Sequence, residues 1–166
     1  MLFRSQATRN GRAGVIGTVG TVDSGAYDRA VKEVDGSIDL VSAACPGLVE
    51  FVERGQTSGH EVRVLTERLL APVSSAGVDA LLLGCTHYPY LARVIGDVMG
   101  PDVVLVSSAD ETAFAVKKML DEAALGEHAG RTGEHRFYSS GDPEWFADLG
   151  SRLFGPELTN AQSWSA

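Results

Sequence analysis

Cys85 is the residue whose type and setting in this sequence best suit chemistry. It lies in the segment Gly84-Cys85-Thr86-His87, directly after an apolar run and ahead of a predicted helix. An unperturbed thiol, with a pKa of about 8.5, is mostly neutral at pH 7, but a helix N-terminus stabilises a thiolate through its N–H groups and dipole. His87 could hydrogen-bond the thiol or protonate a substrate group, and Thr86 offers a hydroxyl and an amide to an anion. The alternative is a structural cysteine beside a core histidine, and the spacing alone does not separate the two.

A second candidate is the glycine-punctuated turn that holds Thr18 and Thr21. Backbone amides between a strand and a helix can bind a carboxylate or a phosphate. The turn lacks the third glycine and the lysine of the common phosphate loops, so helix capping is the alternative for these threonines. Cys45 precedes Pro46 at the end of another predicted strand, and we interpret it as a partly buried, inert thiol.

The sequence predicts neither a metal nor a cofactor. Its two cysteines, Cys45 and Cys85, form no CxxC pair, and no cysteine–histidine cluster has the spacing of zinc ligands. Its lysines, Lys32, Lys117 and Lys118, all fall in predicted helices. None shows the desolvated pocket that a Schiff base to pyridoxal phosphate needs.

Strands that alternate with amphipathic helices must position these side chains. The β-rich runs are residues 13–17, 38–42, 78–83, 103–106 and 135–139. This alternation predicts an α/β fold with a mainly parallel sheet and flanking helices. Ligands of such sheets bind beyond the carboxyl ends of the strands, where three segments fall: 17–21, 44–46 and 84–87. Among the helix starts, Ser58 and Ser108 each open a capping-box pattern, Pro46 suits a first turn, and Asp142 precedes the last helix.

The composition is that of a globular protein and argues against several partners. The chain has 166 residues, 44% of them hydrophobic, and a net charge of −8. An acidic balance argues against binding nucleic-acid phosphates, which needs clustered cations. No apolar run approaches the ~20 residues of a membrane helix. We therefore expect neither a nucleic-acid nor a membrane partner. Two cysteines without a disulfide pattern indicate a reduced, cytoplasmic protein.

Several stretches of the chain resemble the glutamate racemase family of the aspartate/glutamate racemase superfamily. The most specific is Leu81-Leu-Leu-Gly-Cys-Thr-His-Tyr-Pro-Tyr-Leu91, which resembles the family's second signature. Weaker matches are residues 14–22 and 24–27, the Ala44-Cys-Pro46 turn with residues 48–50, and Ser140-Gly-Asp-Pro143. Together they cover nearly the whole chain from about Arg9.

The resemblance implies a racemase that uses neither pyridoxal phosphate nor metal. One cysteine thiolate removes the α-proton of the amino acid, and a second cysteine returns a proton on the opposite face. By resemblance, Cys85 is the second of these cysteines, and Thr86 and His87 match the substrate-contacting pair beside it. The implied function is interconversion of L- and D-glutamate for peptidoglycan synthesis, with His87 after Cys-Thr favouring glutamate over aspartate. An aspartate-type racemase and a non-catalytic binding module are the alternatives, and a gyrase-inhibiting role has no direct support in the sequence.

The chain departs from the family pattern in lacking its N-terminal features. The Asp-Ser pair, the Pro-Tyr-Gly loop and the Cys-Asn-Thr segment with the first cysteine are all absent, and Cys45 matches only the Cys-Pro turn. We therefore expect the C-terminal part of a racemase, inactive alone. By analogy, residues 1–107 form one lobe with the second cysteine, and residues 108–166 return to a lobe that is mostly missing.

The return segment carries two apolar stripes that we expect to be uncovered. One consists of Val116, Met119 and Leu120, and the other of Phe146, Leu149 and Leu153. Together they would form an exposed apolar patch larger than a stable monomer usually tolerates. We therefore expect the chain to form a homodimer or to aggregate.

Overall fold

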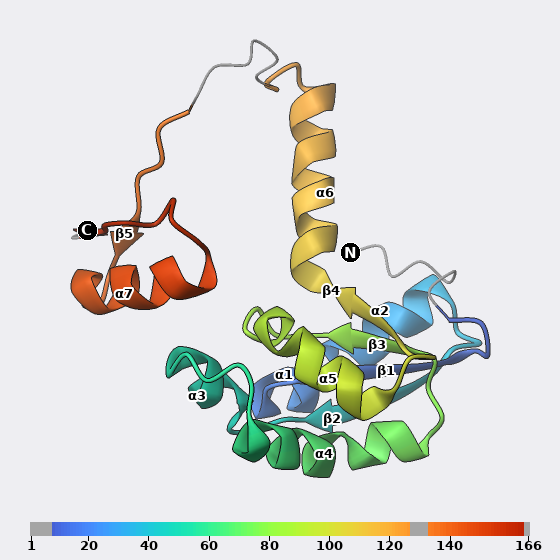
Figure 1. The fold of residues 1–166 in the computed structure, drawn as a ribbon. Helices are drawn as coiled ribbons and strands as arrows, with labels where there is room; N and C mark the ends of the chain where they lie inside the picture. The colour runs from blue at the N-terminus through green and yellow to red at the C-terminus, as the bar shows by residue number, and fades with distance from the viewer. Residues whose placement is uncertain (1–7, 127–132, 165–166) are drawn as a thin grey trace.

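A four-stranded parallel sheet forms the centre of the computed structural model, which describes residues 8–126 and 133–164 (Figure 1). Its order is β2-β1-β3-β4, from β1 (Arg12–Gly17), β2 (Asp39–Ala44), β3 (Ala80–Leu83) and β4 (Val104–Ser107). Each neighbouring pair is parallel and in register. The predicted α/β fold with a mainly parallel sheet is therefore confirmed.

Helices cover both faces of the sheet, and this is why the strand side chains are apolar on both faces. On one face Ile16, Leu81 and Leu83 pack with the helices α3 (Leu48–Glu53), α4 (His60–Ser75) and α5 (Ala92–Met99). On the other face Val15 and Leu82 pack with α2 (Ala26–Val34). Two short helices complete this body: α1 (Val19–Asp23) after β1, and the 3-10 helix η1 (Tyr88–Leu91) ahead of α5.

Several predicted helix starts differ from the observed ones. Gly59, rather than Ser58, caps α4 and makes no side-chain cap, while Pro46 lies in the turn ahead of α3 and not in its first turn. Ser107 caps α6 (Ser108–Glu122), one residue before the predicted Ser108, and its hydroxyl accepts from the Asp110 N–H. Asp142 caps α7 (Pro143–Leu153) as predicted, accepting from two backbone N–H groups.

The chain leaves the sheet after β4 and forms a small C-terminal unit. Helix α6 rises from the end of β4 in Figure 1. The predicted strand at 135–139 shortens to β5 (Tyr138–Ser139), which pairs with β6 (Gln162–Ser163) in a separate two-stranded sheet. The strand was predicted too long, because its partner β6 supplies only two residues to the ladder.

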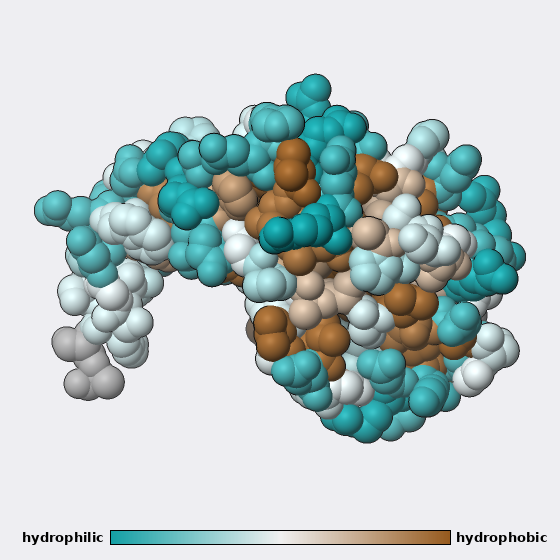
Figure 2. Space-filling model, turned by 90° about the horizontal axis from the view of Figure 1, so that it is seen from below, coloured by the Kyte–Doolittle hydropathy of each residue, from teal (hydrophilic) through white to brown (hydrophobic). Residues whose placement is uncertain are grey.

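The apolar stripe of α7 is largely covered, contrary to expectation. Leu149 is buried, and Leu153 packs against the hydrophobic core that α3, α4 and α5 form with the sheet. Figure 2 shows apolar residues where this C-terminal arm meets the body. The stripe of α6 is exposed, as predicted.

Candidate active site

The carboxyl ends of β1, β2 and β3 bring the three predicted segments to one edge of the sheet. Gly17 pairs with Ala44, and Ile16 pairs with Leu83. Two further backbone hydrogen bonds continue these ladders, from the N–H of Cys45 to the carbonyl of Gly17 and from the N–H of Gly84 to that of Ile16, both 2.8 Å. Thr18, Cys45 and Cys85 therefore follow neighbouring strand ends.

Cys85 follows the four fully buried residues of β3, which fix the strand end in the core. It is a free, half-buried thiol. Gly84 lets the chain pass closely here, because a Cβ at this position would stand 2.8 Å from the Ile16 carbonyl and 3.1 Å from the Tyr27 ring. Tyr27 of α2 thus flanks the cysteine segment, and burial, followed by the proximity of Cys85, raises the pKa of its phenol.

The helix predicted behind Cys85 is present, but it begins as a short 3-10 turn. His87 precedes η1, which starts at Tyr88 with Pro89 in its first turn, and α5 continues the segment from Ala92. The dipole of so short a turn is small, and the side chains around Cys85 add to its effect.

His87 is the side chain that lies within reach of the thiol. Its Nδ1 is 3.9 Å from Cys85 Sγ and 3.5 Å from the hydroxyl of Thr86. Its Nε2 is 3.5 Å from Glu53 Oε1 at the end of α3. A carboxylate at Nε2 favours the tautomer with its proton there, which leaves the Nδ1 lone pair facing the thiol. This arrangement can accept the proton of Cys85.

Glu53 was missed by sequence analysis. It stands in α3, which packs beside η1, and it reaches His87 only in the folded chain. No local motif links the two residues. The one signal is indirect: Glu53 lies on the helix that follows the Cys45-Pro46 turn, itself at the same edge of the sheet.

Cys45 has the opposite setting from Cys85. It is 1% exposed, and its thiol donates to the Ala43 carbonyl at 3.7 Å. Burial raises its pKa to about 12. Its own carbonyl accepts a hydrogen bond of 3.1 Å from the buried Tyr88 hydroxyl. These contacts hold the β2 turn against η1, as the interpretation of an inert thiol predicts.

Thr18 and Thr21 are engaged with each other. Thr18 caps α1, with its hydroxyl accepting from the Thr21 N–H at 3.3 Å, and the two hydroxyls are 2.9 Å apart. Both residues are half-buried at the strand edge. Their capping role is thus observed, and each hydroxyl retains hydrogen-bonding capacity toward a second partner.

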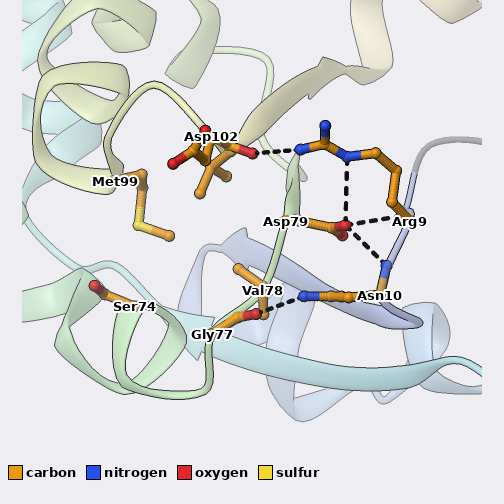
Figure 3. Close-up of a pocket in the computed structure, with 9 residues that line it drawn as sticks. Arg9, Asn10, Ser74, Gly77, Val78, Asp79, Met99 and Asp102 are labelled. Atoms are coloured by element: carbon orange, nitrogen blue, oxygen red, sulfur yellow. Dashed lines mark hydrogen bonds and ion pairs between the residues drawn. The ribbon is translucent and has the colours of Figure 1, made fainter.

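A cavity of about 490 Å³ lies at the other end of the sheet, and Figure 3 shows the side chains that line it. It is lined in part by Arg9, Asn10, Asp79 and Asp102, which precede β1, β3 and β4. It is therefore separate from the Cys85 edge. Within residues 8–126 and 133–164, no three side chains are grouped to hold a metal ion. Over the same residues, no helix combines the length and hydropathy needed to cross a bilayer.

Fold and site together define an α/β protein that groups a thiol, an imidazole and hydroxyls beyond the carboxyl ends of a parallel sheet. The profile of the Asp/Glu/Hydantoin racemase family matches residues 2–116. The chain belongs to this family, and the resemblance of the Cys85 segment to racemases is confirmed.

Similar proteins narrow the relationship further. The chain is 52% identical over 154 residues to the glutamate racemase of Parafrankia, covering 92% of this chain and 55% of that protein. It is 50% identical to that of Acidothermus cellulolyticus, covering 92% and 58%. The chain thus spans a little over half the length of these relatives.

Solved structures give the same result. Glutamate racemase isoform RacE1 from Bacillus anthracis superposes with a TM-score of 0.86 at 33% identity, covering 97% of this chain and 59% of that one. The enzyme from Francisella tularensis, solved with D-glutamate, superposes with a TM-score of 0.83 at 28% identity, covering 93% and 58%.

Proposed function

We propose that this chain carries the Cys85 half of a glutamate racemase, a cofactor-independent isomerase that interconverts L- and D-glutamate for peptidoglycan synthesis. The observation that supports it best is the line of side chains from Glu53 through His87 to Cys85. It stands at the strand edge where α/β folds bind ligands. The glutamate racemases that the chain resembles supply the substrate class.

Racemisation needs a base and an acid on opposite faces of the α-carbon. In one direction the Cys85 thiolate, its proton passed to His87 Nδ1, removes the α-proton and becomes a thiol. The resulting carbanion then takes a proton from an acid on the far side, which inverts the centre. In the other direction Cys85 supplies the proton and the opposite group removes one. Amides and hydroxyls around Thr18, Thr21 and Thr86 hold the substrate carboxylates.

A single base returns the proton to the face it came from. Whether this chain catalyses racemisation therefore depends on the second acid. Cys45 is not suited to the role, because it is buried and its pKa is about 12. We therefore propose that the second acid belongs to the part of the relatives' length that this chain does not span. Residues 1–107 would then form the lobe with Cys85, and residues 108–166 the return segment.

The test compares the 166-residue chain alone with a fusion that adds the unmatched segment of the Parafrankia racemase. Racemisation is followed by circular dichroism of L- and D-glutamate. We expect no turnover from the chain alone, and turnover from the fusion that survives a metal chelator without pyridoxal absorbance. Cys85→Ala should abolish it, whereas the matched Cys45→Ala should retain most of it. Turnover by the chain alone, or by the Cys85→Ala fusion, would contradict the proposal.

A further inference from the structure

Glu53, His87 and Cys85 form a line of side chains that suits a second kind of chemistry. His87 lies between the other two, with its Nδ1 3.9 Å from Cys85 Sγ and its Nε2 3.5 Å from Glu53 Oε1. A thiol beside a base that a carboxylate orients is the arrangement of a cysteine nucleophile. Such a thiol, once its proton has passed to the imidazole, can attack the carbonyl carbon of an ester.

The backbone beside the thiol offers donors for the charge that such an attack creates. The N–H groups of Cys85, Thr86 and His87 have no hydrogen-bond partner within residues 8–126 and 133–164, whereas the next N–H, that of Tyr88, donates to the Cys85 carbonyl at 3.2 Å. Consecutive N–H groups in a turn form concavities that bind anions. Donors of this kind stabilise the oxyanion of a tetrahedral intermediate. The segment therefore holds a nucleophile together with donors for an oxyanion.

Cys85 is open to a small ester, and Cys45 is not. Cys85 is half-buried, and Thr86 beside it is exposed. Cys45 is 1% exposed, and its thiol donates to the Ala43 carbonyl. Because the chain has two cysteines, a thioester that forms on an accessible cysteine must form on Cys85.

We propose that Cys85 also catalyses the hydrolysis of small carboxylic esters whose leaving group is a weakly basic phenoxide or alkoxide. His87 Nδ1 takes the thiol proton as Sγ attacks the carbonyl carbon, and the carbonyl electron pair moves to the oxygen, beside the free N–H groups. The pair then re-forms the C=O bond, the C–O bond to the leaving group breaks, and His87 returns the proton to that group. An acyl thioester remains on Cys85.

Water completes the cycle without any other reactant. His87 takes a proton from the water as the water oxygen attacks the thioester carbonyl. When the tetrahedral intermediate collapses, the C–S bond breaks and the proton passes from His87 to Sγ, which restores the thiol and releases the acid. Hydrolysis needs no second acid on the far side of the substrate, so the inference concerns this chain alone. It uses residues of the proposed racemase site but does not depend on racemisation, and either activity can fail while the other stands.

The first test mixes the 166-residue chain with p-nitrophenyl acetate and follows the release of p-nitrophenolate by absorbance. We expect a burst of about one equivalent, the sign of an acyl-enzyme, followed by steady turnover. Peptide mass spectrometry of the quenched reaction should find the acetyl group on Cys85. A burst without turnover, or the absence of an acetyl group from Cys85, would overturn the proposal.

The second test separates catalysis from the ordinary reactivity of an exposed thiol. His87→Gln keeps the thiol but removes the base, so steady turnover should fall by about 100-fold or more. Glu53→Gln should lower turnover less, since Glu53 acts through His87. His60→Gln changes an exposed histidine at the start of α4, and this matched control should equal the parent chain. Circular dichroism checks that the variants keep the fold. Equal turnover by His87→Gln and the parent would show that the imidazole plays no part and would contradict the proposal.

Discussion

The two cysteines differ in how far water and reagents reach them. Cys85 is half-buried beside His87, whereas Cys45 is 1% exposed and its pKa is raised to about 12 by burial. Because alkylation needs an accessible thiolate, we expect iodoacetamide to modify Cys85 in the folded chain at pH 8 and to leave Cys45 unmodified. Peptide mass spectrometry gives the sites, and unfolding in urea should expose both. Faster modification of Cys45 in the folded state would contradict its assigned burial.

Glu53 is expected to act on Cys85 through His87. Its carboxylate lies 3.5 Å from His87 Nε2 and orients the imidazole toward the thiol. In the fusion described above, Glu53→Gln should lower kcat, by less than the roughly 100-fold or more that loss of an acid–base group costs, with a smaller change in KM. Glu50→Gln, an exposed change in the same helix, is the control. Equal kcat values in both variants would remove Glu53 from the mechanism.

Only part of this constellation could be predicted from the sequence. Cys85, Thr86 and His87 lie in one segment, so their proximity follows from the chain itself. Glu53 comes to His87 only because α3 packs beside η1, and such long-range packing leaves no mark on local spacing. The capping role of Thr18 was open in the sequence, since a hydroxyl in a turn can bind either the backbone or a ligand.

At the scale of elements, the end of β3 depends on a glycine. A Cβ at Gly84 would stand 2.8 Å from the backbone carbonyl of Ile16, which cannot move without breaking the sheet ladder. We expect Gly84→Ala to destabilise the fold by about 1–3 kcal/mol through overpacking. Gly20→Ala is the matched control, because nothing lies within 4 Å of its Cβ in α1, and it should be stabilising by about 0.5–1 kcal/mol. Urea unfolding followed by circular dichroism measures both.

The elements themselves were predictable where hydrophobic periodicity was strong. Buried strands such as β3 and helices such as α4 follow from continuous apolar runs or a repeating stripe. Helix starts were less predictable, since Gly59 rather than Ser58 caps α4 and a capping-box pattern does not specify which residue turns the chain. Strand β5 was predicted too long, because its pairing partner, β6, has too few residues to show a pattern in the sequence.

At the scale of the molecule, the chain is held at both ends of its sheet by different means. At the carboxyl end of the strands, the Cys85 segment lies beside the segments that follow β1 and β2. At the other end Asp79, 8% exposed, ties down the residues that lead into β1. It accepts hydrogen bonds from the Thr8 hydroxyl at 2.6 Å and from the N–H groups of Arg9 and Asn10 at 2.8 and 2.9 Å. Arg9 adds an ion pair at 3.9 Å, visible in Figure 3.

The stability of the whole fold should therefore depend on the ionisation of Asp79. Burial raises its pKa, but the three hydrogen bonds and the charge of Arg9 together outweigh burial and lower it below the ordinary value. A carboxyl whose pKa is lower in the folded than in the unfolded chain stabilises the fold above its unfolded pKa of about 3.9. That contribution is lost as the pH falls through the folded pKa.

Asp79→Asn should remove this contribution at neutral pH. The amide oxygen can still accept from the N–H groups of Arg9 and Asn10, but the amide carries no charge and turns its NH2 group toward the Thr8 hydroxyl, which donates to Asp79 in the parent chain. We expect a loss of about 1–3 kcal/mol in the free energy of unfolding at pH 7. The difference from the parent chain should shrink as the pH falls below the unfolded pKa of about 3.9 toward the lower pKa of the folded carboxyl. Asp39→Asn, an exposed change at the same end of the sheet, should leave both the stability and its pH dependence unchanged. Urea unfolding of the three chains between pH 3 and 7 provides the measurement, and a pH-independent difference between the parent and Asp79→Asn would show that the side chain acts through packing and not through its charge.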